Sequence, residues 1–397
     1  MIRRIENLVN YYIIFILSVA LWPFLSYLGV GNIDGILKYF ALLCMFNSLL
    51  ITLLRDMKYR YLGNILYNLK YVIVLIITII TSSLWSINKE STIQNSLYLI
   101  LTTAYAIYLY MSYPLKDILK MMTKVMFIIA LLSIVIVNIF PQYGMNMYPN
   151  WNGIYSQKNT LGRMMVIGII CSYTCLKTSY FENKINKIFN ISTLILCIIN
   201  LIFSGSTTSI ASIIIIYTFS RLFKFKKKLL SLIIFLCIAI IIFVFINNSY
   251  LFSSLFELIH KDPNLTGRIG IWEISINRIK ESNLMGYGFT ASWDTNYMNR
   301  FNYYKSYMTN SHNGILQLML DIGLIGTLIY IFIFLSTLAK NSVDFCENKY
   351  ENMGLYLILL YLFFTNFFEA LTIQSFSIVW VFQLISILHV EPNFDKG

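Results

Sequence analysis

The chain has 397 residues and a net charge of +12, and 58% of its residues are apolar while only 12% carry a charge. With a mean hydropathy of +0.68, the composition excludes a secreted disulfide scaffold, a cytosolic enzyme and a disordered tail protein. A membrane channel, a transporter and a membrane-embedded enzyme remain as classes.

Apolar stretches predict an all-α polytopic membrane protein with about twelve transmembrane helices, because a bilayer core of about 30 Å takes roughly 20 apolar residues per helix. In chain order, the predicted helices lie near 10–28, 35–54, 65–86, 97–113, 125–143, 161–176, 191–203, 207–222, 229–247, 314–336, 354–370 and 375–390. Basic loops alternate with short loops that hold little more than Lys89 and Lys158. Since basic residues are retained in the cytoplasm, both termini are predicted to be cytoplasmic.

Residues 1–397 are predicted to form a single integral membrane domain, because no internal repeat or flexible linker divides them. Residues 248–313 are predicted to form one large extracytoplasmic loop. Its basic residues do not contradict this placement, because long loops cross membranes largely regardless of charge. Topology explains the positive net charge, so no nucleic acid partner is expected. The six cysteines lie in apolar runs or in a predicted cytoplasmic loop and indicate no disulfide framework.

The external loop carries a pattern suited to phosphates and sugars. Thr266-Gly267-Arg268 is followed by Trp272, by Gly286-Tyr287-Gly288 and by an aromatic run over 293–307. If 268–282 is helical, Arg268 and Trp272 share one face. A guanidinium suits phosphate oxygens, and flat aromatic surfaces pack against sugar rings. The alternative is an amphipathic helix that lies on the membrane with its aromatic residues at the interface.

The motif Ser311-His312-Asn313 opens the next predicted helix and is followed, after nine residues, by Gly323 and Gly326. Eleven helical residues are close to three turns, so His312 and Gly323 are predicted on one face about 16 Å apart, where the glycines let another helix approach. His312 is then predicted at the external end of the membrane spans, where it could transfer a proton. The alternative is that the glycines are ordinary packing and His312 is an interface residue.

Two further polar clusters lie at predicted external helix ends. The first is the run 155–163, in which Lys158, Asn159 and Arg163 surround a helix start that favours an anion. Snorkelling of Lys158 and Arg163 toward lipid headgroups is the alternative. The second is 204–209, a Ser- and Thr-rich turn that is predicted to cap the following helix.

Together, these motifs over about 150–330 resemble the O-antigen polymerase and ligase superfamily of bacterial membrane glycosyltransferases. The resemblance rests on Thr-Gly-Arg with a following Trp, Gly-Tyr-Gly, Ser-His-Asn with Gly-x-x-Gly, the Lys-Asn-x-Leu-Gly run and the Ser-x-Ser turn. It implies a C-type membrane glycosyltransferase-like fold in the bacterial cytoplasmic (inner) membrane. One departure is Thr207, since members often carry an arginine just after the Ser-x-Ser turn, so a phosphate contact there is not carried over.

The resemblance implies a metal-independent transfer of glycan from undecaprenyl pyrophosphate, and the external loops offer no Asp-x-Asp or His cluster for Mg²⁺ or Mn²⁺. No metal and no cofactor are therefore expected. Arg268 is assigned to the pyrophosphate, and His312 is assigned either to activation of the acceptor hydroxyl or to phosphate binding. The predicted substrate-binding residues are Lys158, Asn159, Arg163, Trp272, Tyr287 and Asn313.

Three functions remain open at this point. A polymerase adds lipid-linked glycan to the next lipid-linked repeat of an O-antigen or capsule, a ligase moves it onto a lipid A core, and a flippase carries it across the membrane. The polymerases of this superfamily are more diverse and usually lack further sequence marks, which favours a polymerase for this chain. A flippase does not need a long external loop, so the loop disfavours that function. The expected partners are undecaprenyl-pyrophosphate-linked oligosaccharide, membrane lipid and a chain-length-determining membrane protein.

Overall fold

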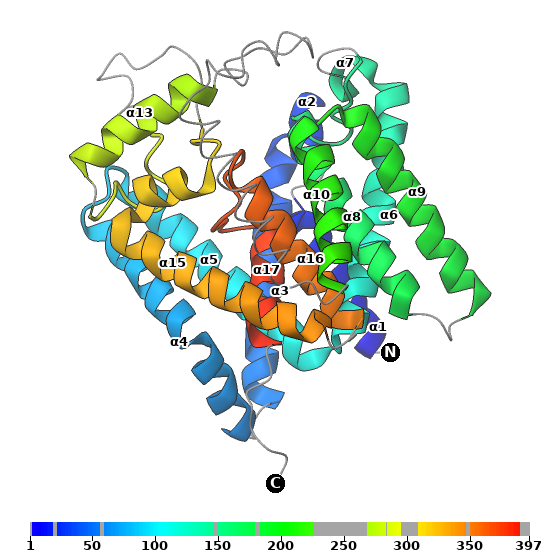
Figure 1. Cartoon of the computed structure of the whole chain (residues 1–397), viewed down its shortest axis with the longest axis horizontal. Coiled ribbons are helices and arrows are strands. Elements are labelled where there is room, and N and C mark those ends of the chain that lie inside the picture. Colours follow the sequence, from blue (N-terminus) through cyan, green and yellow to red (C-terminus); the bar gives the residue numbers. More distant parts are fainter. Residues whose placement is uncertain are drawn as a thin grey trace.

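The computed structural model describes residues 2–18, 22–55, 59–145, 149–178, 183–224, 268–282, 284–294, 309–346 and 350–389. Within these ranges every regular element is helical (Figure 1). The helices are α1 (Ile2–Leu17), α2 (Trp22–Tyr27), α3 (Asn32–Arg55), α4 (Tyr59–Thr81), η1 (Ser82–Leu84), α5 (Lys89–Ser112), α6 (Leu115–Ile139), α7 (Pro141–Gly144), α8 (Lys158–Thr178), α9 (Lys184–Ser204), α10 (Thr207–Lys224), α13 (Arg268–Glu281), α15 (Gly314–Cys346), α16 (Tyr350–Thr365) and α17 (Ile378–Leu388).

Helix ends follow local chemistry in the sequence. Asn88 caps α5 by accepting a hydrogen bond from the Ser91 amide, and Ser377 caps α17 by accepting one from the Val379 amide. Helix α9 is followed by Gly205, whose φ of 59° lies in the left-handed region that glycine adopts at low cost. These capping residues determine where the helices end, and Gly205 thereby fixes the turn of the polar cluster at 204–209.

Six helices of the described chain are long and apolar enough to cross a membrane. They are Gly35–Thr52, Ile65–Leu84, Leu115–Ile139, Lys158–Thr178, Lys184–Ser204 and Gly314–Val343, and shorter apolar helices lie at Thr207–Thr218, Asn352–Thr365 and Ile378–Leu388. This pattern is that of a polytopic membrane protein. The full set of twelve spans stays a prediction, and the expected span at 229–247 lies outside the described residues.

Helix packing sets the frame of the molecule. Helix α8 packs against α9, α6 and α16, while α15 packs against α4 and α16, and α17 packs against α5. Helix α13 packs on α15 and lies at the end of the molecule opposite the start of α1 (Figure 1). The segment that carries Arg268 therefore covers one end of the helices.

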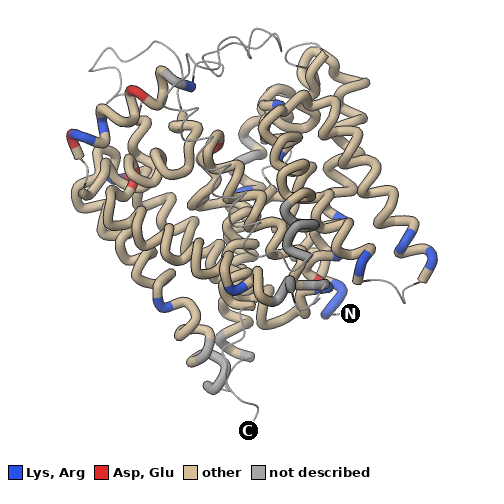
Figure 2. The backbone as a smooth tube through the Cα atoms, in the orientation of Figure 1, with Lys and Arg blue, Asp and Glu red and all other residues tan. Residues whose placement is uncertain are grey.

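Basic residues mark several helix ends that lie away from α13 (Figure 2), although α13 itself also carries Arg268, Arg278 and Lys280. Figure 2 shows Lys and Arg at the ends of α1, α8 and α9 that lie away from α13. Arg3 and Arg4 start α1, Lys177 ends α8, and Lys184 and Lys187 start α9. This end corresponds to the cytoplasmic face predicted from the basic loops.

We expect a reporter fused after Thr178, at the basic end of α8, to report the cytoplasm, because positive residues there resist export. A reporter fused after Ser282, at the end of α13, is expected to report the exterior. Paired alkaline phosphatase and green fluorescent protein fusions at both positions measure this. The opposite side at either position would contradict the topology and the external location of α13.

Helix α15 is not continuous, which corrects the prediction of one unbroken face from His312 to Gly323. Gly323 adopts φ 66° and ψ −171° inside the helix. The break frees the Leu320 and Asp321 carbonyls, which accept hydrogen bonds from the Tyr287 and Gly288 amides at 2.7 and 3.0 Å. A Cβ at Gly323 would clash with the Leu284 carbonyl group. The glycine therefore admits the 284–288 turn, and the close partner is a loop and not a helix.

Candidate active site

The carboxylate of Glu369 lies at the centre of a cluster of predicted site residues. Arg268 Nη2 and Asn159 Nδ2 each donate to Glu369 Oε1 at 3.0 Å. His312 Nδ1 lies 3.7 Å from Glu369 Oε2, which is an ion-pair distance but longer than a hydrogen bond. The cluster thus joins α8, α13, the loop just before α15 and the turn after α16.

The turn that carries Glu369 is fixed by its own hydrogen bonds. The Glu369 amide donates to the Thr365 carbonyl at 2.9 Å, and Asn366 Oδ1 accepts from the Leu371 amide at 2.7 Å. The turn is also tied to the loop of His312, because the Gly314 amide donates to the Asn366 carbonyl at 2.8 Å. Only 9% of the Glu369 side chain is exposed.

His312 occupies a constrained backbone position just before α15. Its φ of 48° lies in the left-handed region, which is uncommon for a residue with a Cβ. The His312 amide donates to Asn310 Oδ1 at 2.9 Å, and Asn313 Oδ1 caps α15 by accepting from the Ile315 and Leu316 amides. This geometry directs an imidazole that is 30% exposed toward Glu369, and its buried Nδ1 has no hydrogen-bond partner in the described chain.

Trp272 fixes α13 to the His312 loop. Its indole Nε1 donates to the Ser311 carbonyl at 3.0 Å, and the side chain is 3% exposed. Arg268, one helical turn earlier, is 11% exposed and reaches Glu369. The predicted shared face of Arg268 and Trp272 is present, with the tryptophan in a supporting position beneath the cluster.

The start of α8 supplies the remaining polar groups. Arg163 Nη2 donates to Thr160 Oγ1 at 2.9 Å, and its buried Nε has no partner among the described residues. Lys158 makes no side-chain hydrogen bond or ion pair with a described residue. A Cβ at Gly162 would lie 2.7 Å from the Ser206 Cβ, so the Ser-x-Ser turn packs directly on this helix start.

The electrostatics of the cluster favour an ionised Glu369. Burial raises the pKa of this carboxyl, but His312 and the guanidinium groups of Arg163 and Arg268 outweigh burial, and the pKa lies below its ordinary value. Burial lowers the pKa of Arg268 while Glu369 opposes that change, and an arginine stays protonated in proteins. Two guanidinium groups thus face one carboxylate, which leaves positive charge available to an anion.

Tyr287 and Asn313 are occupied by contacts within the protein. The Tyr287 hydroxyl donates to the Arg278 carbonyl at 2.9 Å, and the Arg278 guanidinium lies 4.4 Å from the centre of the Tyr287 ring. The Asn313 amide donates to the Phe367 carbonyl at 3.2 Å while its oxygen caps α15. Neither side chain contacts Glu369, so the structure gives both a supporting position rather than an open one.

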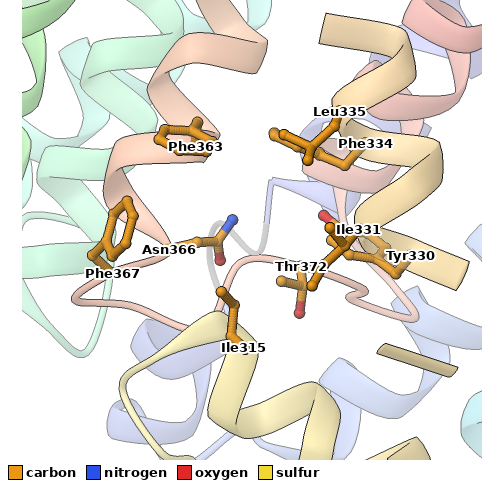
Figure 3. Close-up of a pocket in the computed structure, with 9 residues that line it drawn as sticks. All are labelled: Ile315, Tyr330, Ile331, Phe334, Leu335, Phe363, Asn366, Phe367 and Thr372. Carbon is orange, nitrogen blue, oxygen red and sulfur yellow. The ribbon is translucent and has the colours of Figure 1, made fainter. Parts of the chain in front are cut away.

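Two cavities adjoin the cluster. A polar cavity of about 430 Å³ is lined by Tyr155, Arg163, Trp293, Asn310, Gln317 and Asp321, among other residues. A second cavity of about 230 Å³ is almost entirely apolar. Figure 3 shows Phe363 and Phe367 on one side of it, facing Ile331, Phe334 and Leu335 on the other. Asn366, which also lines this cavity, belongs to the turn that carries Glu369.

Glu369 is absent from the residues predicted from the motifs, although the sequence contains a signal for it. It is the one Asp, Glu, Lys or Arg between Glu351 and Glu391, in a stretch that is otherwise apolar or uncharged. An ionisable residue in such a stretch indicates a functional site. The aromatic run predicted to hold sugars lies outside the described residues from 295 to 307, and Thr266 and Gly267 lie outside them too.

A comparison with protein families finds that residues 192–331 match the O-antigen ligase family model. The matched range contains Arg268, Trp272 and His312, and it begins after Lys158, Asn159 and Arg163. The match supports assignment to the O-antigen polymerase and ligase superfamily that the motifs resemble. A search of curated proteins found no match.

Proposed function

We propose that this chain, as a member of the O-antigen polymerase and ligase superfamily, is a polysaccharide polymerase. It transfers a growing glycan from undecaprenyl pyrophosphate to a lipid-linked repeat unit on the outer face of the cytoplasmic membrane. The observation that carries the proposal is the convergence of Arg268, Asn159 and His312 on Glu369, where helices of a membrane protein end and where the charge of Arg163 also lowers the pKa of the carboxyl.

The pyrophosphate of the donor binds at the guanidinium groups. Arginine presents a planar set of donors that matches phosphate oxygens, and the charge that develops on the leaving group is neutralised by fixed cations. Arg268 is held by Glu369, and Arg163 has a buried Nε that awaits an acceptor. Lys158, at the start of the same helix as Arg163, adds charge at the edge of the site.

His312 activates the acceptor hydroxyl. The imidazole takes the hydroxyl proton, the sugar oxygen forms a bond to the anomeric carbon of the donor, and the bond from that carbon to the pyrophosphate oxygen breaks. The leaving pyrophosphate retains the bonding electrons. Glu369, 3.7 Å from His312 Nδ1, stabilises the imidazolium that forms, much as a carboxylate orients and stabilises the histidine of a hydrolase triad.

The two cavities suit the two parts of a lipid-linked sugar. The polar cavity offers the Tyr155 hydroxyl, which is buried and has no partner in the described chain, together with the amide of Gln374 and the ring of Trp293. Hydroxyl and amide groups beside an aromatic face fit a sugar ring. The apolar cavity between α15 and α16 suits the isoprenoid chain, since Asn366 and Phe367 of the turn that leads to Glu369 line it (Figure 3).

Deletion of this gene in a host with a lipid A core is expected to leave surface glycan capped with a single repeat. Ligation continues on unpolymerised donor when a polymerase is lost, so short capped molecules replace the ladder. Gel electrophoresis of the surface glycan measures this. A second copy of the gene supplied in trans should restore the ladder, which is the control.

Loss of a ligase has a different result. Surface glycan would disappear, and long chains would accumulate on the lipid carrier. That outcome would contradict the polymerase and favour the alternative. Loss of a flippase would leave lipid-linked repeats on the cytoplasmic side of the membrane. A membrane-impermeant lectin would then fail to bind them, which distinguishes this outcome from loss of a polymerase or of a ligase. A chain-length-determining membrane protein is the further partner expected of the polymerase alone.

A further inference from the structure

A third cavity lies far from the Glu369 cluster, between α4 and α15. Its volume is about 300 Å³, and the polar residues Asn68, Lys70, Ser336, Thr337 and Lys340 are among those that line it. Lys340 is near the end of α15 opposite His312. Lys70 is the sixth of the 20 residues of the candidate span Ile65–Leu84, on the side of the span away from Trp85, whose indole donates to the Met285 carbonyl. The cavity therefore faces the end of the molecule predicted to be cytoplasmic.

Both lysines are unusual because they interrupt apolar helices. Lys70 lies within the candidate span Ile65–Leu84, and Lys340 lies within Gly314–Val343. Neither forms an ion pair with a carboxylate among the described residues. A charged side chain within a transmembrane helix is costly, and such residues usually have a partner. Here two cations from distant parts of the sequence border one cavity, and none of the described residues in its wall is a carboxylate.

The remaining wall supplies further donors and a rigid aromatic frame. The Asn68 amide makes no hydrogen bond with a described residue, so its N–H groups are available. Lys70 Nζ lies 4.1 Å from the centre of the Tyr67 ring and 5.1 Å from that of Tyr71. Tyr71 in turn packs edge-on against Phe332 of α15 at 4.9 Å. The tyrosines thus hold the ammonium group at the mouth of the cavity and join the two helices.

We propose that this cavity binds the phosphate headgroup of an anionic phospholipid from the cytoplasmic leaflet. Basic pockets between transmembrane helices on the cytoplasmic side recognise such headgroups. Lys70, Lys340 and Asn68 donate to the phosphate, while exposed Tyr67, Tyr71 and Phe332 contact the upper acyl chains. The site is separate from the proposed transfer reaction and uses none of its residues.

Native mass spectrometry of the purified full chain tests the proposal. Phosphatidylglycerol and phosphatidylethanolamine with identical acyl chains are added in turn, and the dissociation constant of each adduct is measured. We expect tighter binding of phosphatidylglycerol to the unaltered protein. The variants Lys70→Gln and Lys340→Gln should each weaken it about fivefold, and the double variant about thirtyfold, at about 1 kcal/mol per lysine.

A matched control separates the cavity from net charge. Lys184→Gln/Lys187→Gln removes the same charge from the exposed start of α9 and should leave phosphatidylglycerol binding unchanged. Lys70→Arg/Lys340→Arg keeps both charges and should retain the preference. Equal binding of the two lipids to the unaltered protein would overturn the proposal without any variant. So would an equal loss in the α9 control and the cavity double variant.

Discussion

Replacement of His312 by Asn will lower the rate of glycan transfer by about 10²- to 10⁴-fold, the range that a general base contributes. Asn is the informative substitution because His312 has φ 48°, and Asn adopts the left-handed region more readily than other residues with a Cβ. The loop and the cap at Asn313 should therefore survive. The rate is measured with purified protein and a defined lipid-linked repeat.

The protein level in the membrane and the melting temperature serve as controls for His312→Asn. Both should match those of the unaltered protein, whereas His312→Ala adds backbone strain at the same φ. Ordinary activity in the His312→Asn variant would contradict a catalytic role and favour the alternative that His312 is an interface residue. A variant that loses activity only because it melts early would also fail the prediction.

Replacement of Glu369 by Gln will lower the free energy of unfolding by about 3–5 kcal/mol at neutral pH, because Arg268 is left buried beside Arg163 without a counter-charge. The pKa of Glu369 in the folded protein lies below its ordinary value. Its stabilising contribution is therefore complete above the ordinary value and is lost as the pH falls through the lowered one. Thermal melts in detergent across this acidic range measure it.

The difference between the unaltered protein and Glu369→Gln should shrink in acid, since protonation removes the same negative charge. Added pyrophosphate provides a second test at neutral pH. Because the variant has one negative charge fewer in the cluster, pyrophosphate should raise its melting temperature more than that of the unaltered protein. An equal rise in both would contradict a phosphate site at Arg268 and Arg163.

Local patterns in the sequence predicted much of this arrangement. The helix over 268–282 is present as Arg268–Glu281, and its spacing brings Arg268 to the same region as His312. Asn159 also reaches this region, although it is far away in the chain. These residues could be identified because each occurs in a motif at the end of an apolar run, where polar groups are few and their placement is restricted.

Other features depend on contacts that no local pattern contains. The spacing from His312 to Gly323 is also that expected of a packing glycine in a regular helix. The positive φ of Gly323 depends on the 284–288 turn, which packs against it. Trp272 and Tyr287 are aromatic residues of the kind that bind sugars. In the structure both side chains are buried, and their polar groups form hydrogen bonds within the protein. Glu369 lies in no motif, and its role follows from the three side chains that meet it.

The position of Glu369 in the chain also orders the biogenesis of the protein. Ribosomes release Arg163, Arg268 and His312 before α16 and the turn after it, so the cationic groups are made before the carboxylate that binds them. A nascent chain halted before α16 keeps the Trp272 contact between α13 and the His312 loop but lacks the carboxylate that pairs with Arg268. The cluster is therefore complete only after α16 and the turn that follows it have been made.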